Sequence, residues 1–569
     1  MHTATARIWA RRRDRDHICC DWGDRMRLLH LSLPDYRGLR DFHLDLTDAV
    51  DGGHAIATLI GPNGGGKSRV LHALAEVFGA LHRPKHRTAF PFDVHYELRG
   101  TTVRVVQTTR AAAPELTVAQ AGREPTRVPR EQWPHHLPDH VFGYQAHPHA
   151  PWTAEFDQHR RFATRRLSDW RRQWREALDE WLASRPPEEA WPEQLTLPIR
   201  CPLYTPVFLC TPAHLPLLLL AQTTHWADSF GTYLREHSYI QHVASAVLRV
   251  KAPRTVRGAP LAELPYWGLG GPARTLFAAV AQSGRFGPIP DADPVDGAGS
   301  PADGFRIVLG TTEDVQAFRN LFDSDLSMFG LLTTLLDAGY LTVDVRLHKT
   351  GAVMLGLDDL SSGEQQLLTI LGLLRLQRAQ ESLFLLDEPD SHFHPEWSRR
   401  WYSSVRTVLG AHQDSQFITA THEPLLVSNM TRQQIRIIAT DQEGQATAVT
   451  PEATPRGQGA GGLLTTDLFG LPSQLDEHTQ KLIDRQYTLL PAAAHDPVLQ
   501  TELREVTDEL DALGFSTANR DPLVMAFLAE LHRRRRALVE AATSTNPPPP
   551  QVLEAMVAEL FNEHFSSVI

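Results

Sequence analysis

The chain has few cysteines and lacks a long hydrophobic run. Its 569 residues include four cysteines, which form no CxxC pair. This spacing argues against a disulfide framework and indicates reduced thiols in the cytoplasm. The most apolar stretch, residues 211–226, is too short and too interrupted to span a bilayer. We therefore expect a cytoplasmic protein with no membrane partner, no signal peptide and about two to four structural units.

The sequence also lacks a strong positive charge and a long heptad repeat. A net charge of −11 argues against a protein that coats nucleic acid over its whole surface. Arginines do gather with Trp170 and Trp174 on an expected helix over residues 160–175, and another basic run covers residues 533–536. Such a helix either follows a nucleic-acid backbone or forms a solvated face paired with acidic neighbours. Nucleic acid is therefore a candidate partner.

A histidine-rich stretch over residues 135–149 is a second candidate for chemistry. It has no cysteine or carboxylate at metal-ligand spacing, and prolines divide it into loops. We therefore do not expect these histidines to form a metal centre.

What the sequence does have is a phosphate-binding loop. Residues 61–68 read GPNGGGKS and match the pattern G-x-x-x-x-G-K-[ST]. An apolar run before the loop predicts a buried strand, and helical spacing after it predicts a helix whose N-terminus faces the anion. Lys67 is expected to reach the β- and γ-phosphates, and the Ser68 hydroxyl to ligate Mg²⁺. The residues expected to bind ATP are Gly61, Pro62, Asn63, Gly64, Gly65, Gly66, Lys67 and Ser68.

Two carboxylates lie about three hundred residues further along the chain. The apolar run 383–386 predicts a strand that ends in Asp387 and Glu388. Ligands bind at the carboxyl edge of an open α/β sheet, so both carboxylates are expected to face the nucleotide. Asp387 is placed to hold Mg²⁺ through water, and Glu388 is the candidate general base that orients the attacking water.

Five motifs, in chain order, carry a resemblance to the soluble ABC-type ATPases. LSSGEQQ, from Leu360, resembles the LSGGQ signature in the LSxGE form of SMC-like and RecF-like members, with Ser362 in place of a glycine. DEPDSHFHP, from Asp387, is similar to the acid motif and D-loop, and FITATHEPLL, from Phe417, to the switch-histidine strand. VFGYQAH, from Val141, falls where the family has its Q-loop, and residues 26–46 resemble its opening hairpin.

This resemblance implies roles for further residues. Ser361 and Gly363 would contact the γ-phosphate bound to the opposite subunit, which implies a homodimer with two composite sites. His422 would sense the γ-phosphate, and Gln145 would assist both catalysis and Mg²⁺ binding. Arg37, in the opening hairpin, would approach the nucleotide. The implied cofactors are ATP and Mg²⁺.

The expected fold class is α/β, an ABC-ATPase head with an antiparallel β subdomain, a mainly helical insertion and a helical tail. Residues 1–25 are expected to be a disordered extension, or else the true start is Met26. The motifs place the N-terminal lobe at residues 26–150 and the C-terminal lobe at 336–454. The insertion covers 151–335, and the tail, a candidate docking region, covers 455–569.

Three biological roles are compatible with such an ATPase. The DEPDSHFHP form, the insertion without a coiled coil and residues 465–484 resemble AAA-21-type ATPases of bacterial antiphage defence, such as those of Septu and retron systems. In these systems the effector, often a nuclease, is a separate chain. A RecF-like or SMC-like DNA-repair ATPase is the alternative. An OLD-type nuclease fits less well, because the tail lacks the strand-borne DxD cluster that would hold its metals.

Overall fold

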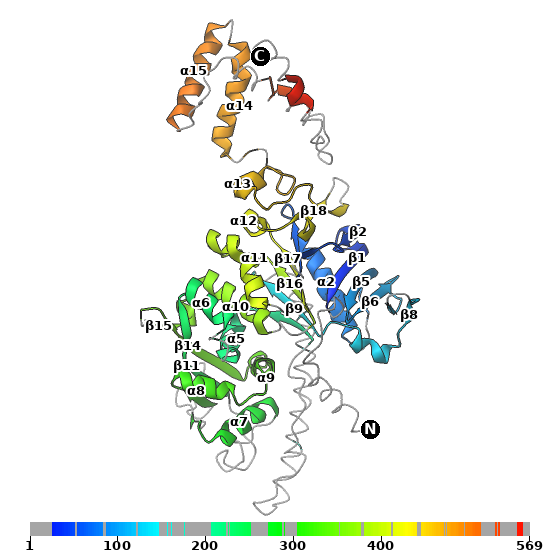
Figure 1. Ribbon diagram of the computed structural model, residues 1–569, viewed down its shortest axis with the longest axis vertical. Helices are drawn as coiled ribbons and strands as arrows, with labels where there is room; N and C mark the ends of the chain where they lie inside the picture. The colour runs from blue at the N-terminus through cyan, green and yellow to red at the C-terminus, as the bar shows by residue number, and fades with distance from the viewer. Residues whose placement is uncertain are drawn as a thin grey trace, which may run out of the picture. The chain divides into compact units, whose positions relative to one another are not determined.

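The computed structural model divides into two compact units, residues 1–460 and 461–569, and Figure 1 shows their elements. It describes residues 25–560 apart from several long gaps and shorter ones of one to four residues. The expected basic helix, His147, His149 and most of residues 1–25 lie outside the described residues. The long gaps are residues 147–155, 157–160, 162–175, 177–205, 252–270, 291–303, 514–529 and 535–554.

The central sheet of the first unit has eight strands, six of which run parallel. Three of its inner strands are buried along their whole length, as expected for parallel strands covered on both faces. The order is β10 (Val207–Cys210), β9 (His140–Gln145), β16 (Ser382–Asp387), β17 (Gln416–Ala420), β4 (His54–Ile60), β18 (Ile435–Thr440) and β19 (Ala446–Val449), with β3 (Val50–Asp51) beside β4.

A six-stranded antiparallel sheet forms the second layer. Its long strands alternate buried and more exposed residues, so one face is directed to the core. The order is β2 (Leu39–Asp45), β1 (Arg27–Tyr36), β5 (Phe92–Leu98), β6 (Thr101–Gln107), β7 (Glu115–Ala119) and β8 (Thr126–Arg127).

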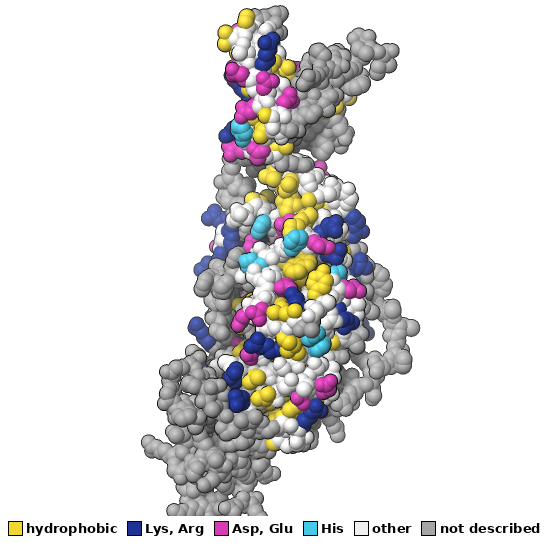
Figure 2. Space-filling model, turned by 90° about the vertical axis from the view of Figure 1, so that its left-hand side faces the viewer, with side chains coloured by type: hydrophobic (Ala, Val, Ile, Leu, Met, Phe, Trp, Pro, Cys, Tyr) yellow, Lys and Arg dark blue, Asp and Glu magenta, His cyan; other side chains and the backbone are white. Residues whose placement is uncertain are grey.

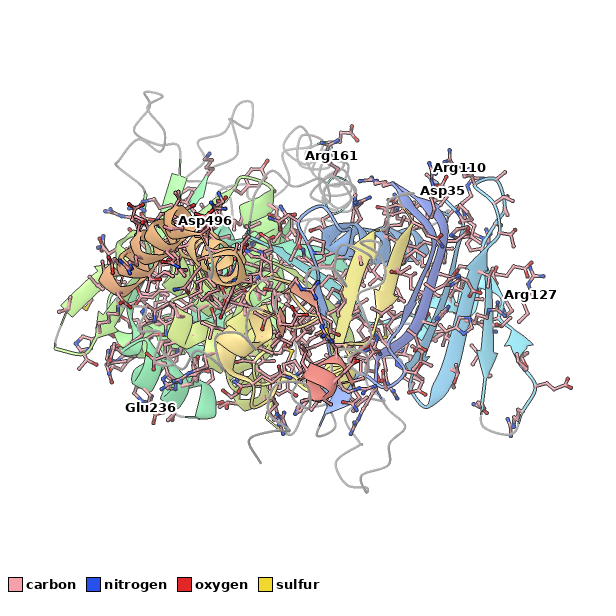
Figure 3. All side chains as sticks on the ribbon, turned by 90° about the horizontal axis from the view of Figure 1, so that it is seen from above. Asp35, Arg110, Arg127, Arg161, Glu236 and Asp496 are labelled. Carbon is pink, nitrogen blue, oxygen red and sulfur yellow. The ribbon has the colours of Figure 1, made fainter. Side chains whose placement is uncertain are left out.

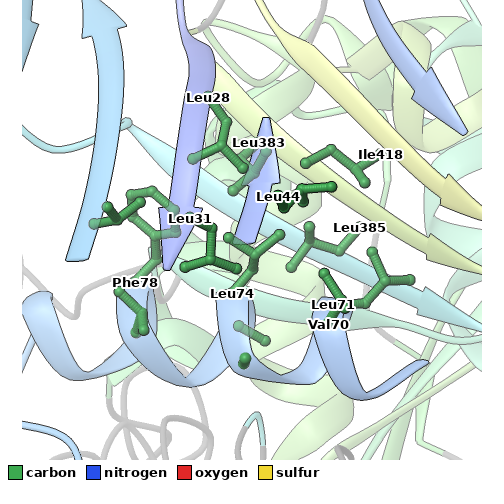
Figure 4. Packing of buried hydrophobic residues seen from close by; sticks show 14 of the residues in the cluster. Leu28, Leu31, Leu44, Val70, Leu71, Leu74, Phe78, Leu383, Leu385 and Ile418 are labelled. Carbon is green, nitrogen blue, oxygen red and sulfur yellow. The ribbon is translucent and has the colours of Figure 1, made fainter. Parts of the chain in front are cut away.

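Helix α2 (Lys67–Leu81) lies between these two sheets. Nearly all of its side chains are buried, including Val70, Leu74 and Phe78. Figure 4 shows these apolar side chains between β1 and the strands that carry Leu385 and Ile418. One core therefore joins the helix that follows the phosphate loop to the strand that carries the two carboxylates.

A second antiparallel sheet lies in the region between the loop and the signature motif. Its order is β12 (Ile289–Pro290), β13 (Gly304–Leu309), β11 (Ile240–Lys251), β14 (Leu341–Lys349) and β15 (Val353–Gly356). β14 and β15 form an antiparallel hairpin, and the strands of residues 207–309 were not predicted. The accompanying helices are α5 (Leu215–Ala221), α6 (Ser229–His237), α7 (Gly271–Ser283), α8 (Thr312–Arg319) and α9 (Asp325–Asp337).

The second unit is helical where it is described. Helices α14 (Glu477–Ala492) and α15 (Pro497–Ala512) pack through a small core of Leu489, Val506 and Leu510. Leu513 is exposed because it lies beyond the end of α15. Across the described residues, no helix is long and apolar enough to cross a bilayer.

Charged side chains are scattered over the first unit. On the face drawn in Figure 2, basic, acidic and histidine side chains alternate among the described residues. Figure 3 shows Arg110 and Arg127 beside the six-stranded sheet and Glu236 on α6, at the opposite side of the unit. On the face drawn in Figure 2, the described basic side chains therefore do not form one continuous patch.

Candidate nucleotide-binding site

The glycine-rich loop connects β4 to α2 at the carboxyl edge of the central sheet. Gly61 has a φ of 141° and its Cα lies so close to β18 that a Cβ would be 2.1 Å from the Ile438 carbonyl oxygen. Gly66, with a φ of 113°, caps α2. Both positions need glycine, because other residues rarely adopt these torsions. The loop thus leaves the first turn of α2, with its free N–H groups, facing the edge of the sheet.

Lys67 is buried at the start of α2. Its Nζ donates to the carbonyl oxygens of Gly61, at 2.8 Å, and Pro62, at 3.2 Å. Burial lowers the pKa of Lys67, and attraction to Glu388 and Asp387 partly offsets that effect. The ammonium group is therefore held over the loop and close to both carboxylates.

Ser68 and Asp387 are 319 residues apart in the sequence and meet here. The Ser68 hydroxyl donates to Oδ1 of Asp387 across 3.0 Å. A hydroxyl and a carboxylate are oxygen ligands of the kind that Mg²⁺ uses together with phosphates and water. The donor set therefore fits Mg²⁺.

Glu388 follows Asp387 directly at the tip of β16. Its backbone has a φ of 48°, rare outside glycine, and its N–H donates to the Ala420 carbonyl at the end of β17. This turn places Oε1 of Glu388 3.4 Å from Nδ1 of His422. The strained backbone is typical of functional positions.

Gln145 completes the row of polar residues along this edge. It ends β9 and is paired in register with Asp387, while Asp387 is paired with Ala420 on β17. The structure therefore brings Gln145, Asp387, Glu388 and His422 together at the ends of three adjacent strands.

Arg37 occupies the turn between β1 and β2, with a φ of 46°. Its Nη1 lies 2.8 Å from Nδ1 of His72 on α2, and its carbonyl accepts from Arg69. Burial, and then the positive charge of Arg37, lower the pKa of His72 to about 4, so His72 is neutral and accepts this bond at neutral pH. Arg37 is thereby attached to the helix that follows the loop.

The signature residues lie at the start of α10 (Ser362–Leu376). Ser361 is exposed, and its backbone N–H and hydroxyl both donate to the Glu364 carboxylate. Lys349, at the end of β14, forms a 2.6 Å ion pair with Glu364 and lowers its pKa against the effect of burial. Gly363 is packed so tightly that a Cβ would be 2.4 Å from the His392 carbonyl oxygen.

Gln366 connects α10 to the D-loop, defined here as residues 389–394. Its Nε2 donates to the Glu388 carbonyl at 3.3 Å, and its Oε1 accepts the His392 N–H at 3.2 Å. Sequence reasoning did not identify Gln366, Lys349 or the Asp390–Thr421 pair described below. Only the position of Gln366 inside the LSSGEQQ motif could have drawn attention to it.

Three histidines of the histidine-rich stretch, His135, His136 and His140, lie in the part of the chain that the structure describes. There, no three His, Cys, Asp or Glu residues are arranged to hold a metal ion. His140 is half-buried at the start of β9, and desolvation lowers its pKa to about 3.

Two curated proteins are similar in sequence over part of their length. The Septu protein PtuA of Bacillus mycoides (strain KBAB4) is 27% identical over 161 residues, which cover 27% of this chain and 22% of that protein. The "Retron Vc95 probable ATPase" of Vibrio cholerae serotype O1 biovar El Tor is 28% identical over 133 residues, covering 21% and 25%. The matches thus span about a quarter of each relative.

A family model and solved structures give further similarities. The AAA_21 family, described as "AAA domain, putative AbiEii toxin, Type IV TA system", matches residues 258–428. The SMC head domain from Thermotoga maritima has a TM-score of 0.31 and 11% identity, and covers 75% of this chain and 100% of that one. The recombination mediator protein RecF-ATPrS has the same TM-score and identity, and the match covers 75% of this chain and 99% of that one.

The α/β fold is the expected one. Over part of its length the chain is similar to the AAA_21 family, to the Septu protein PtuA and to the retron ATPase, as the motifs of an ABC-type ATPase predict.

Proposed function

We propose that this protein binds Mg-ATP and hydrolyses it as a head-to-tail homodimer. The observation that carries the proposal is the Ser68–Asp387 hydrogen bond beside the Glu388–His422 contact. Segments more than three hundred residues apart have no structural need to place four such polar groups at one edge, whereas phosphoryl transfer requires them there.

Each residue at this edge of the central sheet then has a role in binding or hydrolysing ATP. Loop residues 61–66 and Lys67 bind the phosphates, and Arg37 lies near the nucleotide. Ser68, Asp387 and Gln145 hold Mg²⁺, directly or through water. Glu388 takes the proton of the attacking water, and His422 binds the γ-phosphate. Mg²⁺, when bound, neutralises charge on the phosphates.

The second half of the site comes from another copy of the chain. Ser361 is exposed and Gly363 lies within the first turn of α10, where free backbone N–H groups favour an anion. In a head-to-tail dimer these groups meet the γ-phosphate bound by the partner copy. ATP then holds the two copies together, and hydrolysis releases them.

We further propose that this ATPase cycle controls a separate effector, such as a nuclease, in a bacterial antiphage defence complex in the cytoplasm. Similarity to the Septu and retron proteins supports this role. The helical unit of residues 461–569 is the candidate docking region for that effector. The division into lobes at residues 26–150 and 336–454, with an insertion between them, remains part of the proposal.

Phosphate release and native mass test the proposal together. Wild-type protein should release phosphate from Mg-ATP, and Glu388→Gln should bind ATP but hydrolyse it roughly 100- to 10,000-fold more slowly, the usual contribution of a general base. The control is Glu115→Gln, an exposed carboxylate on β7 paired with Arg127, which should match wild type. Full turnover by Glu388→Gln would refute the assignment of the base.

Native mass spectrometry of Glu388→Gln, expressed with its genomic neighbours and purified in Mg-ATP, tests the assembly. A dimer with a second bound protein would support the defence role, and a monomer in Mg-ATP would refute the composite site. A dimer that carries DNA instead of protein would overturn the defence role in favour of a DNA-repair ATPase.

A further inference from the structure

Asp390, in the D-loop, is a buried carboxylate that the reaction described above does not use. Only 8% of its surface is exposed, and its Oδ2 accepts a 2.8 Å hydrogen bond from the hydroxyl of Thr421. Burial raises the pKa of Asp390 to about 6. Burying an acid against a neutral hydroxyl costs free energy. Stability therefore does not explain why an aspartate occupies this position.

Thr421 is the residue between β17 and His422. Its hydroxyl, which donates to Asp390, also accepts the N–H of Glu423 at 3.0 Å, on the other side of His422. Its own N–H donates to the Leu59 carbonyl of β4, the strand that leads into the phosphate loop. The backbone on both sides of His422 is therefore fixed by contacts of one threonine.

The hydrogen bonds of Thr421 lead to the contact between Glu388 and His422. Oε1 of Glu388 lies 3.4 Å from Nδ1 of His422, although more than half of the His422 side chain is exposed to solvent. An exposed imidazole has several available rotamers, so its position depends on how firmly its backbone is held. Asp390 lies two residues after Glu388 and thus connects the two ends of the contact.

We propose that Asp390 is a positioning residue for ATP hydrolysis, which through Thr421 fixes the backbone of His422 and keeps its imidazole beside Glu388. This inference rests on the proposed roles of Glu388 and His422. It adds a connection inside one subunit, from the D-loop to the switch histidine. Neither Glu388 nor His422 needs this connection in order to bind ATP.

The charge state of Asp390 decides the direction of its hydrogen bond. An ionised carboxylate only accepts, so Thr421 must donate to it. A protonated carboxyl can also donate to Thr421 through its O–H, and the oxygen that still accepts no longer carries a negative charge, so the bond from the threonine hydroxyl is weaker. Three other titratable groups surround the connection: Glu423 raises the pKa of Asp390, His422 lowers it, and Glu388 lies beyond His422. The connection is therefore complete above about pH 6 and weakens as the pH falls through that value.

A pair of threonine variants gives the sharpest test. Thr421→Ser keeps the hydroxyl, and Thr421→Val keeps the shape of the side chain without it. We expect Thr421→Ser to stay within about threefold of wild type, and Thr421→Val to lose roughly 10- to 100-fold in kcat with little change in KM. Equal kcat values for the two variants would overturn the proposal.

The pH profile separates positioning from a general loss of structure. Between pH 5.5 and 8.5, the kcat of wild type should fall on the acid side near pH 6. Asp390→Asn, which cannot ionise, should lack this fall, and Asp390→Ala should resemble Thr421→Val. If the kcat of Asp390→Asn still fell near pH 6 as in wild type, the role of the carboxylate would be contradicted. This conclusion does not depend on whether Asp390→Ala is stable.

A double variant distinguishes this inference from the proposed function. If Asp390 acts through His422, then His422→Ala combined with Asp390→Ala should be no slower than His422→Ala alone. Additive losses would refute the connection while leaving the proposed ATPase intact. Absence of any ATP turnover in wild type would instead refute the proposed function.

Discussion

Replacing Gly363 with alanine should disturb both stability and turnover, because the added methyl group has no space. Its Cβ would lie 2.4 Å from the His392 carbonyl oxygen and 3.3 Å from the Trp397 ring, whereas ordinary contacts begin at 3.4 Å. Helix α10 and the D-loop must therefore separate by about 1 Å. Separation by that much would also break the two hydrogen bonds of Gln366, which are already 3.2 and 3.3 Å long.

The expected loss of folding free energy is about 2–4 kcal/mol, from overpacking and the weakened hydrogen bonds. Thermal unfolding of the nucleotide-free protein should show it, at about 2–4 °C per kcal/mol for a unit of this kind. Because Gln366 also holds the Glu388 carbonyl, turnover should fall roughly 100-fold, the scale of a 1 Å misplacement.

Gly372→Ala, in the same helix, is the matched control. Its nearest neighbour would be the Cβ of Leu218 at 3.3 Å, only about 0.1 Å inside ordinary contact, so we expect turnover within twofold of wild type. If Gly363→Ala lost turnover but kept the unfolding temperature of wild type, the phosphate contact rather than the close packing would explain this glycine. Normal turnover and normal stability together would refute the reasoning.

Three further predictions concern residues on both sides of the composite site. Lys67→Ala should abolish binding of a fluorescent ATP analogue, since it removes the ammonium group that contacts the Gly61 and Pro62 carbonyls; binding within threefold of wild type would contradict this. Ser361→Arg should abolish turnover and ATP-dependent dimerisation while leaving ATP binding by the monomer intact, as measured by native mass and binding assays. Lys349→Met should destabilise the protein by about 1–3 kcal/mol at neutral pH, because it leaves Glu364 charged and partly buried. The pKa of Glu364 is lowered in the folded protein, so its ionised form contributes stability above its usual value of 4.5, and the deficit of Lys349→Met should shrink as the pH falls below that value.

The sequence predicted those parts of the site that are contiguous in the chain. The strand, loop and helix around Lys67 follow from glycine spacing and an apolar run, and the tip of β16 follows from four apolar residues before Asp387. The register that puts Gln145 opposite Asp387 depends on pairing between strands about 240 residues apart. Gln366 and Thr421 act through tertiary hydrogen bonds, which no local pattern reveals.

The second antiparallel sheet escaped prediction for a specific physical reason. Its central strand, β11, contains two register shifts near its start, so its buried residues Ile240, Val243 and Ala246 are spaced three apart. This spacing resembles one face of a helix rather than the alternation of a strand. Only its second half, with buried Ala246, Leu248 and Val250, alternates as a strand should.

The pairing of β4 with β17 and β18 affects how the protein is made. Ala55 pairs with Gln416, about 360 residues later, so a ribosome must synthesise most of the chain before the strand preceding the phosphate loop finds its neighbours. At about 5–20 residues per second, this delay is roughly 20–70 s. During that time β4, a largely apolar strand, has only the short β3 beside it, although the six-stranded sheet can form from residues 27–127 alone. The nascent chain is therefore expected to need chaperone protection, and the enzyme to acquire its site only near the end of synthesis.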